Sequence, residues 1–153
     1  MRTVSPPHTW AYALRLPHDP RAARVARMTV RSVLASHGRA EVLDAVELLT
    51  SEMVTNTYLH TNGPASLRLT ALADGRLRVG LWDSHPRVPA PFGRPPHDHV
   101  PLARPDADGG RGLRLVQEYA DCWGGMSLGS LGSTGAGTFD RRSGKLLWFE
   151  MSG

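Results

Sequence analysis

The chain has 153 residues, a net charge of +4, 41% hydrophobic residues and one cysteine, Cys122. This length and apolar fraction support a single domain with a hydrophobic core and exclude a largely disordered chain. One cysteine excludes an internal disulfide framework, and no apolar run reaches the ~20 residues that a membrane-spanning helix needs. We therefore expect a soluble, cytoplasmic protein that has no contact with a membrane.

The first part of the chain predicts one strand and two helices. Apolar residues alternate over 9–16, which indicates a strand. Asp19 and Pro20 form a typical helix start, with the aspartate as N-cap, and Gly38 ends this first helix. A second helix is expected from about 40 to 60, where an apolar stripe recurs at helical spacing.

The second part predicts a hairpin, a long loop and a closing sheet. Two alternating segments flank the tight turn Asp74-Gly75 and indicate a hairpin. The proline-rich stretch 84–108 lacks apolar periodicity and is either a disordered surface insertion or a lid, and its position between Asp83 and the glycine turn favours the lid. The remaining elements are a short helix and two strands, expected over 112–121, 123–128 and 145–151.

A polar pair stands on the otherwise apolar second helix. Glu52 and Asn56 are four residues apart, so both side chains lie on one helical face, one turn apart. A carboxylate and an amide among apolar neighbours lose free energy on burial unless a partner satisfies them. Glu52 is a candidate general base, and Asn56 is a candidate oxygen ligand of Mg²⁺. The alternative is that Glu52 lies at the helix surface and Asn56 bonds locally.

Two later segments offer partners for this pair. Asp83 ends the strand-like segment 77–83 and is either a turn acid or a buried acceptor for an exocyclic amine such as that of adenine. The turn 109–112 places Arg111 among three glycines before a new helix, where amide groups and a guanidinium suit phosphate. Alone, the glycine turn is a weak signal, because two glycines before a helix often form only a tight turn. The combination predicts a nucleotide site.

In this order and spacing, the motifs resemble the GHKL-type (Bergerat) ATP-binding fold, in the small form of anti-sigma-factor serine kinases and related actinobacterial regulators. The resemblance covers about residues 9–152, and its motif segments are 47–56 (N box), 81–86 and 109–116 (glycine boxes), 119–124, and 144–150 (closing strand). It implies an α+β fold: a two-layer α/β sandwich with a mixed, mostly antiparallel sheet and helices on one face. The chain would be one such domain over 1–153.

The resemblance also implies a role for each matching residue. Glu52 would be the catalytic base, Asn56 would hold Mg²⁺ against the phosphates of ATP, and Asp83 would receive the adenine amine. The phosphates would be wrapped by Gly110, Arg111, Gly112 and Leu113, under an ATP lid formed by 84–108.

The implied activity is to bind a sigma factor and to phosphorylate an antagonist protein on serine or threonine. Members of the family often work as dimers, so a homodimer is a further implied arrangement, although no feature of the sequence marks an interface.

Three positions depart from the family pattern. The first glycine box normally carries a glycine two residues after the aspartate, and this chain has His85 there. The closing strand usually offers a threonine near the adenine, whereas here Leu146 follows Lys145. The connection 129–142 is longer than expected. These departures bear on nucleotide affinity and turnover more than on the fold.

Three functions remain open at this point. The first is an ATP- and Mg²⁺-dependent protein serine/threonine kinase that also sequesters a transcription factor. The alternative is a nucleotide-binding or degenerate regulatory module that acts by protein contact without turnover. Direct nucleic-acid binding ranks well below both, because the arginines are spread along the chain without a run.

Overall fold

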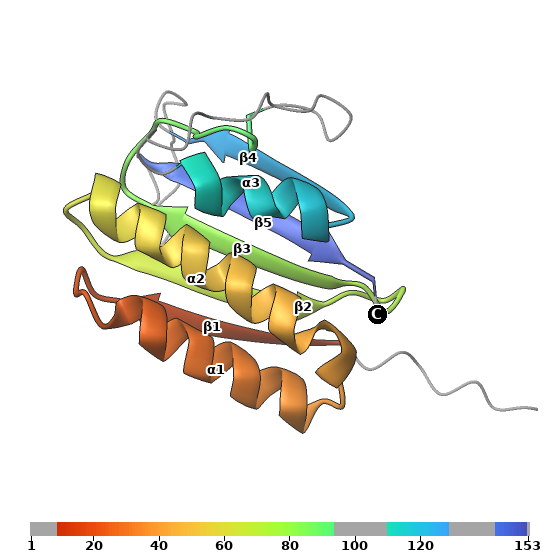
Figure 1. Cartoon of the computed structure of the whole chain (residues 1–153). Coiled ribbons are helices and arrows are strands. Elements are labelled where there is room, and N and C mark those ends of the chain that lie inside the picture. The colour runs from red at the N-terminus through yellow and green to blue at the C-terminus, as the bar shows by residue number, and fades with distance from the viewer. Residues whose placement is uncertain (1–8, 94–109, 129–142, 153) are drawn as a thin grey trace, which may run out of the picture.

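The computed structural model describes residues 9–93, 110–128 and 143–152. Its elements, in chain order, are β1 (Trp10–Leu16), α1 (Ala22–Ser36), η1 (Ala40–Val42), α2 (Leu43–His60), β2 (Ala65–Ala71), β3 (Leu77–Asp83), α3 (Gly110–Tyr119), β4 (Cys122–Ser127) and β5 (Lys145–Met151) (Figure 1). None of the helices among these residues is both long and apolar enough to cross a membrane.

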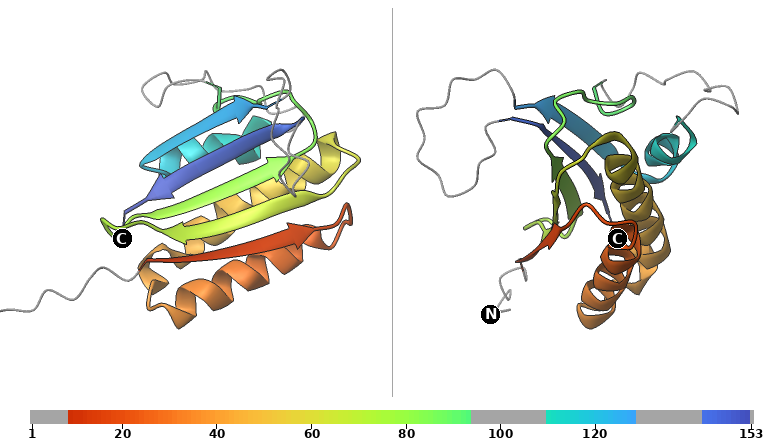
Figure 2. Two further views of the ribbon diagram at one scale, coloured as in Figure 1. Left: turned by 180° about the vertical axis from the view of Figure 1, so that it is seen from behind. Right: turned by 90° about the vertical axis from the view of Figure 1, so that its left-hand side faces the viewer.

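The strands form one five-stranded sheet in the order β1-β2-β3-β5-β4. Every neighbouring pair of these strands is antiparallel. All three α-helices lie against the same face of the sheet (Figures 1 and 2). The two-layer α+β sandwich is therefore confirmed, with a fully antiparallel sheet in the described strands where a mixed, mostly antiparallel one was expected.

The core lies between the sheet and the helices, as the period-two and helical patterns predict. Alternate side chains of β2, β3 and β5 are buried against the inner face of α2, which is the central helix of the layer. The fully buried residues include Leu67, Leu69, Val79, Leu81, Phe149, Val46, Leu49 and Met53. This packing fixes α2 over β3, the strand that ends in the predicted site residue Asp83.

Two helix starts differ from the prediction. The N-cap position of α1 is Arg21, and the carboxylate of Asp19 accepts a hydrogen bond from the Arg21 backbone N–H at 2.8 Å. The difference is small, because helix ends assigned by different criteria vary by one or two residues. α3 begins at Gly110, inside the glycine turn, rather than at Gly112.

The segment after β3 is packed at its beginning. Phe92 is 1% exposed and belongs to the core, with Val88 packed against the same cluster. Both side chains lie over Gly125 of β4, where an added Cβ would come within about 3.0 Å of each. Of the expected lid over 84–108, the part up to 93 is thus anchored on the sheet. The rest of that lid, and the connection 129–142, lie outside the described residues.

Candidate functional site

Asp83 ends β3 with a buried, fully hydrogen-bonded carboxylate. Its side chain is 1% exposed. Lys145 Nζ lies 2.8 Å from Oδ1 and 2.8 Å from Oδ2. The Thr57 hydroxyl donates to Oδ2 at 2.9 Å, and the His85 backbone N–H donates to Oδ1 at 3.0 Å. An ionised carboxylate offers about four lone-pair sites, so these contacts occupy all of them.

Lys145 reaches Asp83 because of the pairing between β3 and β5. The two residues stand directly opposite each other in this antiparallel ladder. The lysine side chain is 3% exposed, and its Nζ also lies 3.4 Å from the His85 carbonyl oxygen. An ammonium group has three N–H donors, and the two carboxylate oxygens and this carbonyl account for them. The acceptors of Asp83 and the donors of Lys145 therefore all have partners.

Gly144 allows β5 to begin this close to Asp83. Its φ is +114°, a value that side-chain-bearing residues rarely adopt. A Cβ at this position would lie 2.0 Å from the Asp83 carbonyl oxygen. The glycine before Lys145 is thus required by a close approach of two backbones, and this approach sets the lysine against the carboxylate.

The structure corrects which residue fills the closing-strand position. The family pattern of the closing strand drew attention to Leu146. Leu146 pairs with Trp82, however, and so lies on the opposite face of the sheet from Asp83. Lys145 occupies the place beside the carboxylate instead. The signal that could have found it is a lysine at the start of an otherwise apolar strand, where a buried cation requires a buried anion.

Glu52 and Asn56 lie together on one flank of α2, and both are half-buried. The other flank contacts α1, where Arg31 donates to Glu47 at 2.6 Å and Arg27 donates to Ser51 at 2.8 Å. Each residue of a helix turns about 100° from the previous one, so Glu52 and Asn56 point away from α1. They therefore lie on the side of α2 where α3 packs (Figure 1).

The structure brings several of the predicted site residues into one region. Asn56 is adjacent to Thr57, whose hydroxyl donates to Asp83, so the C-terminal part of α2 meets the end of β3. α3 packs against α2 and starts at Gly110, with Leu113 buried at 3% exposure. The side chain of Arg111 lies outside the described residues, so its predicted role and those of Gly110 and Gly112 stay predictions.

The role of Asp83 toward adenine stays a prediction, because the carboxylate is already paired in this structure. The exocyclic amine of adenine needs a carboxylate oxygen with a free lone pair, and Lys145, Thr57 and the His85 N–H contact both oxygens. Adenine would have to displace a buried ammonium group that has no other anion beside it among its hydrogen-bond partners.

The described part of the site offers few ligands for a metal ion. Among the described residues, no group of three or more His, Cys, Asp or Glu side chains could hold a metal ion. Asn56 could supply a single neutral oxygen, which fits the way Mg²⁺ takes few protein ligands and completes its shell with phosphate and water.

The sheet order and helix layer are those of a two-layer sandwich of the ATPase type. Residues 16–123 match the histidine kinase-like ATPase domain family, and the chain belongs to that family. An uncharacterized protein from Streptomyces coelicolor is 41% identical over 61 residues. That match covers 40% of this chain and 51% of the relative, so the chain spans about half the length of the curated relative it matches.

Family membership has a general functional meaning. It makes the chain a histidine kinase-like ATPase domain and supports an ATP-linked regulatory function. Within this fold, the Asp83–Lys145 pair is the buried charge pair at the end of β3.

Proposed function

We propose that this protein is a regulatory module that acts through protein contact, and that it takes ATP only weakly because adenine must displace Lys145. The observation that carries the proposal is the buried ion pair between Lys145 and Asp83. This ion pair occupies the carboxylate that the family resemblance assigns to the adenine amine. Turnover of ATP is then not the output of the protein.

The energetics of a buried pair support weak binding. Removing one partner from such a pair costs about 3–5 kcal/mol, because the other charge stays buried without compensation. A neutral adenine amine cannot replace the positive charge of Lys145 beside Asp83. Since every 1.4 kcal/mol is tenfold in affinity, the pair should weaken base binding by roughly 100-fold or more.

The proposed partners follow from the family resemblance. They are a sigma factor, which the module would hold, and an antagonist protein, which would compete for it. Two features support regulation by contact. The domain has a complete hydrophobic core, and the carboxylate that would receive the adenine base is already paired with Lys145. A homodimer remains part of the proposal, as does a cytoplasmic location.

Calorimetry with Mg·ATP tests the proposal directly. The intact protein should give little heat, whereas Lys145→Thr should bind at least tenfold more tightly, because it frees the acceptor on Asp83. Lys145→Arg keeps a cation beside the carboxylate and should behave like the intact protein. The exposed Arg24→Thr on α1 is the matched control for losing a positive charge.

The outcome that contradicts the proposal is tight binding of Mg·ATP by the intact protein, with no gain in Lys145→Thr. If Lys145→Thr does not fold, the double variant Asp83→Asn/Lys145→Thr removes both charges and reports on the stability of the pocket. The affinity of the intact protein then decides the question alone.

A second candidate function is phosphoryl transfer, which the position of Glu52 favours. This carboxylate is half-buried beside Asn56 and has no hydrogen bond or ion pair to any residue that the structure describes. It is therefore available as a base for a substrate hydroxyl. Incubation with γ-labelled ATP and candidate antagonists tests this function. Transfer that is lost in Glu52→Gln would favour the kinase over the contact-only module.

A further inference from the structure

The sheet has one face that no described element covers. The helices lie on the inner face. The opposite, outer face is turned toward the viewer in the left view of Figure 2. Strand pairing arranges its side chains in three rows, which run from β1 to β4 across the sheet. The rows are Ala11–Thr70–Arg78–Glu150–Cys122, Ala13–Arg68–Gly80–Trp148–Gly124 and Arg15–Ser66–Trp82–Leu146–Met126. We call this surface the outer face.

A hollow of about 470 Å³ lies in the middle of the outer face. Gly80 forms its floor, where an added Cβ would meet nothing closer than 3.8 Å. Trp82, Leu146 and Trp148 give it an apolar lining, and Arg68 stands beside it, directly opposite Gly80. Such a hollow accepts an apolar side chain and presents a guanidinium at its edge.

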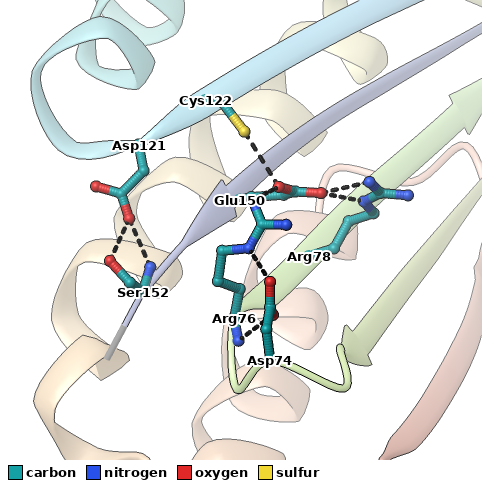
Figure 3. A network of polar contacts seen from close by, with 7 residues as sticks. All are labelled: Asp74, Arg76, Arg78, Asp121, Cys122, Glu150 and Ser152. Atoms are coloured by element: carbon teal, nitrogen blue, oxygen red, sulfur yellow. Dashed lines mark hydrogen bonds and ion pairs between the residues drawn. The ribbon is translucent and has the colours of Figure 1, made fainter.

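The outer face carries an excess of positive charge. Arg15 and Arg68 are exposed and form no ion pair with any described residue. The one acid in the three rows is Glu150, whose side chain is 3% exposed. Arg78 lies across this carboxylate with Nε at 2.7 Å, and Arg76 lies 2.7 Å from its other oxygen (Figure 3).

Glu150 is held charged within this network. Burial by itself would raise the pKa of its carboxyl, but the Cys122 thiol and the two guanidinium groups outweigh burial and lower that pKa. The carboxylate thereby orders Arg78, which also lies over the Trp148 ring at 5.1 Å. A buried acid thus positions cations on the outer face and offers almost no negative surface of its own.

We propose that the outer face binds an acidic segment of a partner protein, with a carboxylate on Arg68 and an apolar side chain in the hollow over Gly80. The inference rests on the proposed function by protein contact, and it names the surface and the chemistry of the partner. Charge complementarity carries it, because exposed arginines beside an apolar hollow match a segment that alternates acidic and apolar residues.

Other occupants fit this surface less well. A second copy would bring the same positively charged face against this one in an isologous contact, which like charges oppose. The connection 129–142 has Asp140 as its one acid, next to Arg141 and Arg142, so its charge does not complement the face.

Nucleic acid would need free aromatic faces for base stacking. Trp148 has Arg78 over one side of its ring, and the backbone of Gly124 lies so close to the indole that a Cβ there would come within 2.5 Å. That ring therefore cannot serve as a stacking platform.

Nuclear magnetic resonance titration of the full chain tests the proposal. The probe is a short synthetic peptide that alternates Asp or Glu with Leu, and its control is the same peptide with Asn and Gln in place of the acids. We expect shifts at Arg68, Gly80 and the Trp82 indole with the acidic peptide, and none on α1. The amide peptide should bind about tenfold more weakly.

Two variants locate the contact. Arg68→Glu should lower the affinity for the acidic peptide by about tenfold or more, since it loses a charge-assisted bond and adds repulsion. Gly80→Val should fill the hollow without disturbing the core, because space is open above this residue and its φ is not positive. Arg24→Glu, a matched charge change on α1, should leave binding unchanged.

Four results would overturn the proposal. They are no shift on the outer face, equal binding of the acidic and amide peptides, binding at this face by a single-stranded oligonucleotide alone, and a dimer in sedimentation that Gly80→Val dissociates. Arg68 and Gly80 lie on the sheet face away from Asp83, so these tests are separate from calorimetry with ATP. Tight ATP binding would defeat the proposed function and leave the peptide result intact, and the reverse also holds.

Discussion

The variant Lys145→Met tests the central ion pair most directly. It removes the ammonium group and leaves the Asp83 carboxylate at 1% exposure with two neutral donors, the Thr57 hydroxyl and the His85 N–H. Loss of one partner from a buried pair costs about 3–5 kcal/mol, and the two remaining donors place this site near the lower end, at about 3 kcal/mol. At about 2–4 °C per kcal/mol for a domain of this size, the Tm should fall by about 6–12 °C.

A double-mutant cycle separates the pair from other effects of the lysine. Asp83→Asn combined with Lys145→Met replaces both charges with neutral groups, so the double variant should be more stable than Lys145→Met alone. Urea denaturation followed by tryptophan fluorescence measures each free energy of unfolding. The exposed Arg24→Met should change stability by no more than about 0.5 kcal/mol.

Two results would refute the reasoning. One is a loss of less than about 1 kcal/mol in Lys145→Met, which would mean that the carboxylate has no buried cation to lose. The other is a double variant whose destabilisation equals the sum of the two single changes, since independent residues behave additively. Either result would also remove the basis for weak ATP binding.

Three further predictions concern other sites. The pKa of Glu150 is lowered in the fold from its usual 4.5, so its stabilisation is present above that pH and is lost as the pH falls through the folded pKa; Glu150→Gln should flatten the acid limb of stability in denaturation measured across pH. Burial and the neighbouring Glu150 raise the pKa of Cys122 from 9.0 to about 11, so iodoacetamide should alkylate the folded thiol about 100-fold more slowly than the unfolded one. Gly144→Ala places a Cβ 2.0 Å from the Asp83 carbonyl oxygen and should lose more than about 3 kcal/mol in denaturation, whereas Gly38→Ala, also at positive φ but with nothing within 4 Å, should lose about 1 kcal/mol.

The sequence predicted most of the local structure, because local structure depends on periodicity and turn chemistry that are visible in one segment at a time. The alternation over 77–83 predicted β3, and the turn Asp74-Gly75 predicted its hairpin with β2. The sequence also favoured one layer of helices on the sheet, as found. It missed the packing of Phe92, because one aromatic residue in a proline-rich stretch has no periodic pattern around it.

For the candidate site, too, the sequence predicted the local arrangement but not the packing around it. Glu52 and Asn56 share a flank of α2 because their spacing is a property of the helix itself, and the sequence alone sufficed for that. Whether they act on Mg²⁺ and a substrate hydroxyl stays a prediction. The position of α3 beside them depends on helix packing that no local pattern specifies.

By itself, the sequence determined that an acid ends a central strand and that a lysine begins the last one. Only the tertiary structure decided that these two charges meet, because β5 inserts between β3 and β4 and brings residues 62 positions apart into register. Strand order and register arise from packing across the whole sheet, and they also leave the arginines of three strands together on the outer face.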